Sequence, residues 1–169
     1  MAYLVSYKKM KRLNLGCGAD YREGWTNIDS RCKIKTDITH NLDSFPYPFK
    51  TNTFDEIFMK MVLEHLTDPI KTMKEVIRIS KKNAKITVIV PHAFSYANNT
   101  DIQHKSNFTE NSFEKNLLEE YELEELKLTK REFLFPYNKW KRYIPFKGVL
   151  KIFFNGIYDD LLFEFEVKK

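Results

Sequence analysis

Two closely spaced glycines and a carboxylate near the N-terminus could together bind a nucleoside. Gly16 and Gly18 follow a short apolar run at residues 12–15, which is typical of a strand that ends in a tight turn. Because glycine lacks a Cβ atom, the backbone there can turn sharply and approach a ligand. Asp29 ends the next predicted strand, at the edge where open α/β sheets bind ligands, and its carboxylate can accept hydrogen bonds from both ribose hydroxyls.

The spacing after these glycines argues against a dinucleotide. A dinucleotide-binding turn has a third glycine three residues after the second, and Tyr21 occupies that position. Its side chain would obstruct the approach of a pyrophosphate. The residues therefore favour a nucleoside without phosphates, and the alternative is a plain tight turn with Asp29 as an ordinary strand-end residue.

A second group of reactive side chains lies past the middle of the chain. His104 is the candidate general base, because the ordinary pKa of histidine lies near neutrality, and Asp101 three residues earlier could orient it. The alternative is an exposed histidine in a polar loop. His92 could join these two residues in a metal site, but the spacing matches no standard signature, so we expect no metal.

The elements that must position these residues follow from hydrophobic patterning. Strands are predicted at residues 12–15, 25–29, 35–41, 54–59 and 84–90. A helix begins with Asp68 as its cap and Pro69 at its first position, and it closes near residues 81–83. The nearly continuous β-branched run 84–90 is typical of a strand buried on both faces of a parallel sheet.

The residue pattern of the C-terminal part is different. We predict a loop at residues 92–107 and then a helix that Thr109 caps, with Phe108 packing on Phe113. Residues 121–128 and 161–167 alternate apolar and charged side chains, which predicts two antiparallel edge strands. Strands interleaved with helices, followed by this pair, indicate an α/β fold: a three-layer sandwich around a mostly parallel sheet.

Composition is consistent with one globular domain. Of 169 residues, 43% are hydrophobic and 30% are charged. The net charge of +5 permits a nucleic-acid partner without favouring one, because the lysines are scattered. Cys17 and Cys32 make neither a disulfide framework nor a metal site. No stretch predicts a membrane span or a signal peptide, so we expect a cytoplasmic protein.

Three stretches together resemble the class I S-adenosylmethionine-dependent methyltransferases, in the subgroup called type 11. They are "LNLGCG" at residues 13–18, "DITHNL…FPYPF" at 37–49 and "FDEIFMKMVLEHL" at 54–66. The resemblance covers residues 12–92 and implies a Rossmann-like fold with S-adenosylmethionine as cofactor. It also implies a single domain over 1–169, with a cofactor-binding half at 12–92 and an acceptor-side half at 93–169.

The resemblance also implies roles for individual residues. Gly16, Cys17 and Gly18 would lie along the methionine and ribose of the cofactor, Asp29 would hold the ribose hydroxyls, Asn41 and Leu42 would lie beside the adenine, and Lys60 and Met61 near the sulfonium. Glu64 and His65 belong to the recurrent "LEH" signature. They could either start a structural helix or act in catalysis.

The sequence departs from the family pattern at two places. Only eleven positions separate Gly18 from Asp29, so the first helix of the family is expected to be reduced to a loop at residues 20–24. A compact subgroup with "G-C-G…G-W-x-N-x-D" is similar in this respect. Asn41 stands where an acid is common, although its amide oxygen can still bond an adenine amino group.

The expected activity is methyl transfer to oxygen or nitrogen of a small-molecule or glycan-type acceptor. The alternatives are a nucleic-acid or protein methyltransferase, or a cofactor-binding partner subunit without activity. The basic and aromatic segment 137–158 is predicted to cover one sheet edge, with a substrate lid or a membrane-facing patch as the alternatives. The sequence leaves the oligomeric state open.

Overall fold

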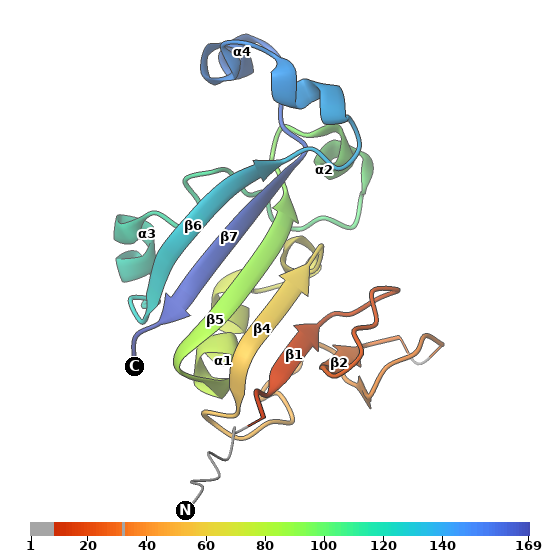
Figure 1. The fold of residues 1–169 in the computed structure, drawn as a ribbon, viewed down its shortest axis with the longest axis vertical. Coiled ribbons are helices and arrows are strands. Elements are labelled where there is room, and N and C mark those ends of the chain that lie inside the picture. Colours follow the sequence, from red (N-terminus) through yellow and green to blue (C-terminus); the bar gives the residue numbers. More distant parts are fainter. Residues whose placement is uncertain (1–8, 32) are drawn as a thin grey trace, which may run out of the picture.

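A seven-stranded sheet organises the computed structural model, which describes residues 9–31 and 33–169 (Figure 1). The strands are β1 (Arg12–Leu15), β2 (Thr26–Asp29), β3 (Ile38–Thr39), β4 (Phe54–Lys60), β5 (Ser80–Pro91), β6 (Leu126–Leu134) and β7 (Asp160–Val167). Their order in the sheet is β3-β2-β1-β4-β5-β7-β6. The first five strands are parallel, and β7 runs antiparallel between β5 and β6. The predicted α/β class and the mostly parallel sheet are confirmed.

The helices connect the later strands. They are α1 (Pro69–Ile79), α2 (Tyr96–Thr100), α3 (Lys115–Glu120) and α4 (Lys147–Phe153), with 3-10 turns η1 (Leu63–His65) and η2 (Lys139–Tyr143). Figure 1 shows α1 and α3 behind the sheet, and α4 beyond the end of β6. Among the described residues no helix is long and apolar enough to cross a bilayer.

Helix α1 begins as predicted but ends earlier. An Asp68 side-chain oxygen accepts a hydrogen bond from the Lys71 backbone N–H at 2.8 Å, and Pro69 follows at the first helical position. The helix ends at Ile79 because Ser80 already pairs with Phe54 in the sheet. The prediction that residues 81–83 close the helix was wrong, since they belong to β5.

The face of the sheet toward α1 and α3 carries the core. Phe163 and Phe165 of β7 are fully buried, and Phe113 packs edge-on against both, at ring distances of 4.9 and 5.2 Å. The predicted contact between Phe108 and Phe113 is confirmed, with ring centroids 6.0 Å apart. The predicted Thr109 cap was wrong, because the chain makes turns there and α3 begins only at Lys115.

Three smaller predictions also need correction. The strand expected at residues 35–41 is reduced to Ile38–Thr39. The loop expected at 92–107 contains the short helix α2. The strand expected at 121–128 begins only at Leu126, because Tyr121 and Glu122 form a turn in which Glu122 has a positive φ of 57°. The predicted antiparallel pairing of the last two strands is confirmed.

The opposite face of the sheet is polar. In register across four strands lie Arg12, Glu56, Lys85 and Glu166, whose charges alternate. Arg12 pairs with Glu56 at 3.2 Å. No described helix covers this face (Figure 1), and the chain between Gly18 and Thr26 is a loop, as predicted. The second helical layer of the expected sandwich is therefore not formed by the described residues.

Candidate functional site

The glycine turn after β1 is built for close approach of the chain after β4. Gly16 and Gly18 both have positive φ angles, of 69° and 52°. The N–H groups of Gly16 and Cys17 donate to the Ile28 carbonyl at 2.8 and 3.0 Å, which ties the turn to β2. A Cβ on Gly16 would lie 2.4 Å from a methyl carbon of Val62, so only glycine fits there.

Asp29 is fixed beside this turn as a buried carboxylate. One oxygen accepts the Gly18 N–H at 2.8 Å, and the other accepts the Arg31 N–H at 2.9 Å and its Nε at 3.2 Å. Burial alone would raise the Asp29 pKa, but these donors outweigh it and lower the pKa below its ordinary value. A carboxylate has about four acceptor positions, so one remains beside these three donors. A second ligand hydroxyl could take the place of Arg31 Nε, whose side chain is largely exposed.

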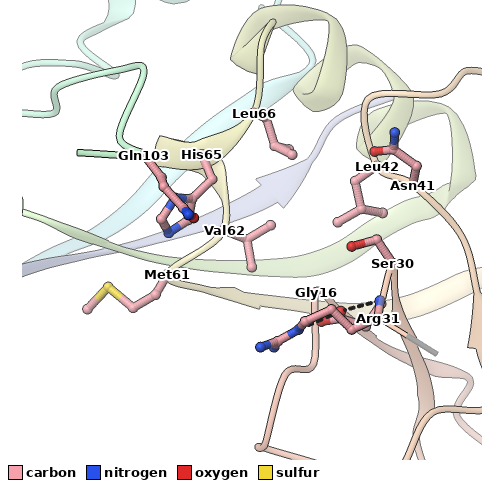
Figure 2. Close-up of a pocket in the computed structure, with 11 residues that line it drawn as sticks. Gly16, Ser30, Arg31, Asn41, Leu42, Met61, Val62, His65, Leu66 and Gln103 are labelled. Carbon is pink, nitrogen blue, oxygen red and sulfur yellow. Dashed lines mark hydrogen bonds and ion pairs between the residues drawn. The ribbon is translucent and has the colours of Figure 1, made fainter. Parts of the chain in front are cut away.

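A cavity of about 320 Å³ opens where these elements meet (Figure 2). Its described lining residues are Gly16, Asp29, Ser30, Arg31, Asn41, Leu42, Met61, Val62, His65, Leu66 and Gln103. Figure 2 shows Met61, His65 and Gln103 at one end, with Asn41 and Leu42 at the other. The volume is within the range of small-molecule sites, and the position at the carboxyl ends of parallel strands is the usual one.

Five of the predicted cofactor residues line this cavity, and three do not. Gly18 contributes its N–H to Asp29 instead. Cys17 is buried with its sulfur 3.9 Å from the Lys35 carbonyl oxygen, and burial raises the pKa of its thiol. Lys60 ends β4 with an exposed side chain. The other cysteine, Cys32, is outside the described residues.

His104 lies behind the cavity, and its orienting partner differs from the expected one. Its Nδ1 is 3.1 Å from the Asn98 carbonyl oxygen, whereas Nε2 is 3.8 Å from the Asp101 carboxylate, too far for a hydrogen bond. Asn98 therefore orients the ring, and Asp101 acts on it only through charge. The His104 ring packs on the His65 ring, with centroids 4.7 Å apart, and His65 lines the cavity.

Glu64 completes a cluster with these two histidines. It is fully buried, and neither carboxylate oxygen has a hydrogen-bond partner among the described residues. Burial, aided by the nearby charge of Asp160, raises the Glu64 pKa to about 7. One potential metal-ligating atom from each of Glu64, His65 and His104 lies within 4.8 Å of the others.

The metal set weighed from the sequence is not brought together. His92, directly after β5, is buried and lies 3.3 Å from the Glu110 carboxylate, beside the rings of Phe133 and Tyr158. The described metal-capable cluster uses the "LEH" residues instead. No definite role for these residues follows from the sequence, because their proximity to His104 depends on how the chain returns after β5.

Sequence reasoning missed five lining residues. They are Ser30, Arg31, Val62, Leu66 and Gln103. A usable signal existed for the first four, since two directly follow Asp29 and two flank the "LEH" signature. Gln103 carries no such signal, because it comes from a loop that only the tertiary structure brings to the cavity.

The strand order, the glycine turn and the cavity at Asp29 define the chain as having the fold of the class I S-adenosylmethionine-dependent methyltransferases. In agreement, residues 17–88 match the family model described as a methyltransferase domain. The resemblance seen in the sequence is thereby confirmed, and S-adenosylmethionine is the cofactor that this resemblance implies. A comparison with curated proteins gives no match.

Solved structures share this fold at low sequence identity. One is a putative methyltransferase from Haloferax volcanii in complex with the Trm112 methyltransferase activator, with 14% identity, a TM-score of 0.66, and coverage of 96% of this chain and 84% of that one. Another is a SAM-dependent methyltransferase from Archaeoglobus fulgidus, with 17% identity, a TM-score of 0.65, and coverage of 95% and 87%. A third, from Mesorhizobium loti, has 14% identity, a TM-score of 0.64, and coverage of 93% and 90%. At these identities the similarity establishes the fold alone.

Proposed function

We propose that this protein is a methyltransferase that moves the methyl group of S-adenosylmethionine to oxygen or nitrogen of a small-molecule or glycan-type acceptor. The observation that carries the proposal is the cavity beside the glycine turn, with the charged Asp29 in its wall. Residues 12–92 form its cofactor-binding half, and residues 93–169 its acceptor side. The predicted cytoplasmic location stays a prediction.

The residues present fit this cofactor. Gly16 lines the cavity, and the turn that it forms with Cys17 and Gly18 suits the methionine and ribose of the cofactor. Asp29 is placed for the ribose hydroxyls, and Asn41 and Leu42 at the far end of the cavity suit the adenine. In this orientation the sulfonium would lie toward Met61, on the side of His65 and Gln103, whereas Lys60 does not line the cavity. The bound cofactor supplies an activated methyl group on a sulfonium, so alignment of the acceptor is the protein's main task.

His104 is the residue proposed to activate the acceptor. The Asn98 carbonyl can only accept a hydrogen bond, so Nδ1 carries a proton and Nε2 presents a lone pair. In the simplest mode Nε2 of His104 accepts the proton that the methyl acceptor loses. The alternatives are a nucleic-acid or protein acceptor and a partner subunit without activity. They share the cofactor site and differ in what binds beside His104.

Titration calorimetry with S-adenosylhomocysteine tests the cofactor site. Asp29→Asn should weaken binding about 10- to 100-fold, because a charge-assisted hydrogen bond contributes about 1.5–3 kcal/mol. Glu124→Gln, which removes an exposed carboxylate away from the cavity, should leave the affinity unchanged. Wild-type protein without affinity for the ligand, or an Asp29→Asn variant that binds equally well, would refute the proposal.

A further inference from the structure

Three side chains with metal-ligating atoms meet at His65, which lines one end of the cavity. Glu64 and His65 form η1 directly after β4, and His104 comes from the segment after α2. One donor atom of each lies within 4.8 Å of the others, and Glu64 Oε1 is 3.9 Å from His65 Nε2. The backbone holds the two segments together, because the Glu64 carbonyl accepts the N–H groups of Lys105 and Ser106 at 2.8 and 3.2 Å.

Glu64 is the residue that protein contacts leave unexplained. Its side chain has no exposed surface, and among the described residues neither carboxylate oxygen has a hydrogen-bond partner. Buried carboxylates are normally paired with a cation, hydrogen-bonded, or bound to a metal. Glu64 is thus a buried acidic side chain beside two imidazoles, a set of groups that can hold a cation.

One of the two histidines, His104, is held in the way that metal-binding histidines usually are. A ligating imidazole normally donates its other N–H to a carbonyl or carboxylate, which fixes the tautomer and the ring. The Asn98 carbonyl holds His104 Nδ1 in this way and leaves Nε2 free. His65 packs against this ring and lines the cavity, so the cluster is connected to the cavity through His65.

We propose that Glu64, His65 and His104 bind a divalent transition-metal cation whose open coordination positions receive the acceptor oxygen. Two imidazoles and one carboxylate suit cations such as Zn²⁺, and three protein ligands with an open position are typical of a catalytic metal site. Metal–ligand distances of about 2.0–2.2 Å require the three side chains to rotate inward from their present separations. The inference rests on the proposed methyl transfer.

The cation would change how the acceptor is activated. An acceptor hydroxyl bound to the metal loses its proton to solvent more readily, as metal-bound water does. The resulting oxygen forms a bond to the methyl carbon while the carbon–sulfur bond breaks, and sulfur keeps the electron pair. In this mode His104 acts as a ligand in place of a proton acceptor.

Binding of Zn²⁺ alone tests the site, by calorimetry on protein treated with chelator and by metal analysis after dialysis. We expect one Zn²⁺ per chain, with affinity at least tenfold weaker in Glu64→Gln and in His104→Ala. His40→Ala is the matched control, because His40 lies outside the cluster and bonds the Ser44 carbonyl, and it should retain the metal. Wild-type protein that binds no stoichiometric Zn²⁺, or a Glu64→Gln variant that folds and binds it equally well, would overturn the proposal.

The same samples separate this proposal from the methyltransferase assignment. S-adenosylhomocysteine titrated in the presence of chelator should still bind, because Asp29 and the glycine turn are independent of the cluster. If this ligand binds while Zn²⁺ does not, only the metal site falls, and His104 acts as a base. If Zn²⁺ binds while S-adenosylhomocysteine does not, the proposed function is refuted. The role of the metal in methyl transfer is then refuted as well.

A second surface is distinguished by charge and by exposed aromatic residues. Residues 137–154 contain five of the 28 Lys and Arg residues and none of the 23 acidic ones, so the rest of the chain is electrically balanced. They also contain seven of the eleven exposed large hydrophobic residues of the described chain: Tyr137, Trp140, Tyr143, Phe146, Val149, Phe153 and Phe154. Helix α4 in this segment extends past the end of the sheet (Figure 1), whereas Tyr158, at the end of the predicted segment 137–158, stacks on Phe133 of β6.

We infer that this segment docks on an anionic lipid surface. Exposed Trp, Tyr and Phe beside basic residues favour the interface of a bilayer, and the concentration of the chain's positive charge favours an anionic one. Among the basic residues, Lys139 and Arg142 are exposed and free to face lipid headgroups, whereas Lys141 bonds Asp159 at 2.5 Å. Docking there would place the carboxyl edge of the sheet toward the membrane.

Vesicle sedimentation tests this surface. Vesicles with about one third phosphatidylglycerol should retain the protein, neutral phosphatidylcholine vesicles should not, and raised salt should release it. A Trp140→Ser, Phe146→Ser variant should lose at least tenfold in vesicle affinity, whereas Ile102→Ser, which removes an exposed side chain elsewhere, should not. Absence of binding to anionic vesicles, or a wild-type dimer that the double variant dissociates, would overturn the inference.

Discussion

Replacing Gly16 with alanine should damage both the fold and the cofactor site. The residue has a φ of +69°, which an alanine adopts only with strain. The added Cβ would lie 2.4 and 2.9 Å from the two methyl carbons of Val62, far inside normal contact distance. Val62 follows β4 and lines the same cavity, so relief of the clash must move a cavity wall.

The magnitude follows from these two terms. A left-handed backbone costs a non-glycine residue about 1–2 kcal/mol, and overpacking costs about 1–3 kcal/mol, so Gly16→Ala should lose about 2–5 kcal/mol of unfolding free energy. Gly24→Ala is the matched control. It has a φ of +78° but nothing within 4 Å of the added Cβ, so it should show only the backbone cost.

Urea unfolding of wild type and variants measures the difference, and titration with S-adenosylhomocysteine measures the effect on the cavity. Adding Val62→Ala to Gly16→Ala removes both methyl carbons, and it should recover the overpacking part in a double-mutant cycle. A Gly16→Ala variant no less stable than Gly24→Ala would refute the close approach of Gly16 and Val62. A double-mutant cycle that shows no coupling between positions 16 and 62 would refute Val62 as the cause of the destabilisation.

Three further variants address other parts of the chain. Donors from Tyr47 and Arg78 outweigh burial and lower the Glu75 pKa, so Glu75→Gln should cost about 1–3 kcal/mol at pH 7. The loss should shrink as pH falls below about 4.5, which urea unfolding at two pH values checks. Burial and the charge of Asp159 raise the Asp160 pKa to about 7. The free-energy cost of ionising Asp160 in the folded protein therefore appears as pH rises from about 4 to 7. Thermal unfolding should therefore show Asp160→Asn more stable than wild type at pH 8, by up to about 4 kcal/mol, with little difference at pH 4. Phe163→Ala should cost about 3–5 kcal/mol in urea unfolding, whereas Phe153→Ala, at an exposed position, should cost under about 0.5 kcal/mol.

Local signals allowed the fold to be predicted where the residues themselves decide the outcome. Asp68 and Pro69 start α1 in the predicted way, because capping depends on neighbouring residues only. The end of α1 and the start of β6 could not be predicted. Ser80 leaves the helix because it pairs with Phe54, a partner 26 positions away in the sequence, and tertiary pairing of this kind overrides local propensity.

The same distinction between local and tertiary causes separates the site residues that could be predicted from those that could not. Gly16 and Asp29 could be predicted, because a turn and a strand end identify themselves in sequence. The contact between His65 and His104 could not, because it depends on hydrogen bonds from the backbone near His104 to the Glu64 carbonyl. Spacing also made Asp101 the expected partner of His104, whereas a backbone carbonyl, which has no sequence signature, holds the ring.

Asn27 explains how a short loop can replace the first helix of the fold. Its side chain is fully buried and accepts the Arg22 N–H at 2.9 Å and an Asn14 amide N–H at 3.0 Å. It donates to the carbonyls of Arg22 and Trp25 at 3.0 and 3.1 Å. One side chain therefore satisfies the backbone groups of the loop and fixes it to β1.

The polar face of the sheet is consistent with a loop in place of the first helix. A helix in that position would need apolar residues beneath it, whereas Arg12, Glu56 and Lys85 lie there and pair across strands. The Arg22 guanidinium in the loop instead lies over the Phe58 ring, 3.5 Å from its centroid, and covers this half-buried aromatic side chain. Asn27 also precedes Ile28, whose carbonyl anchors the glycine turn, so the loop, β2 and the turn form one hydrogen-bonded unit. The cofactor site can thus keep its geometry without a helix behind it, because this unit, and not a helical layer, holds Gly16 and Asp29 in place.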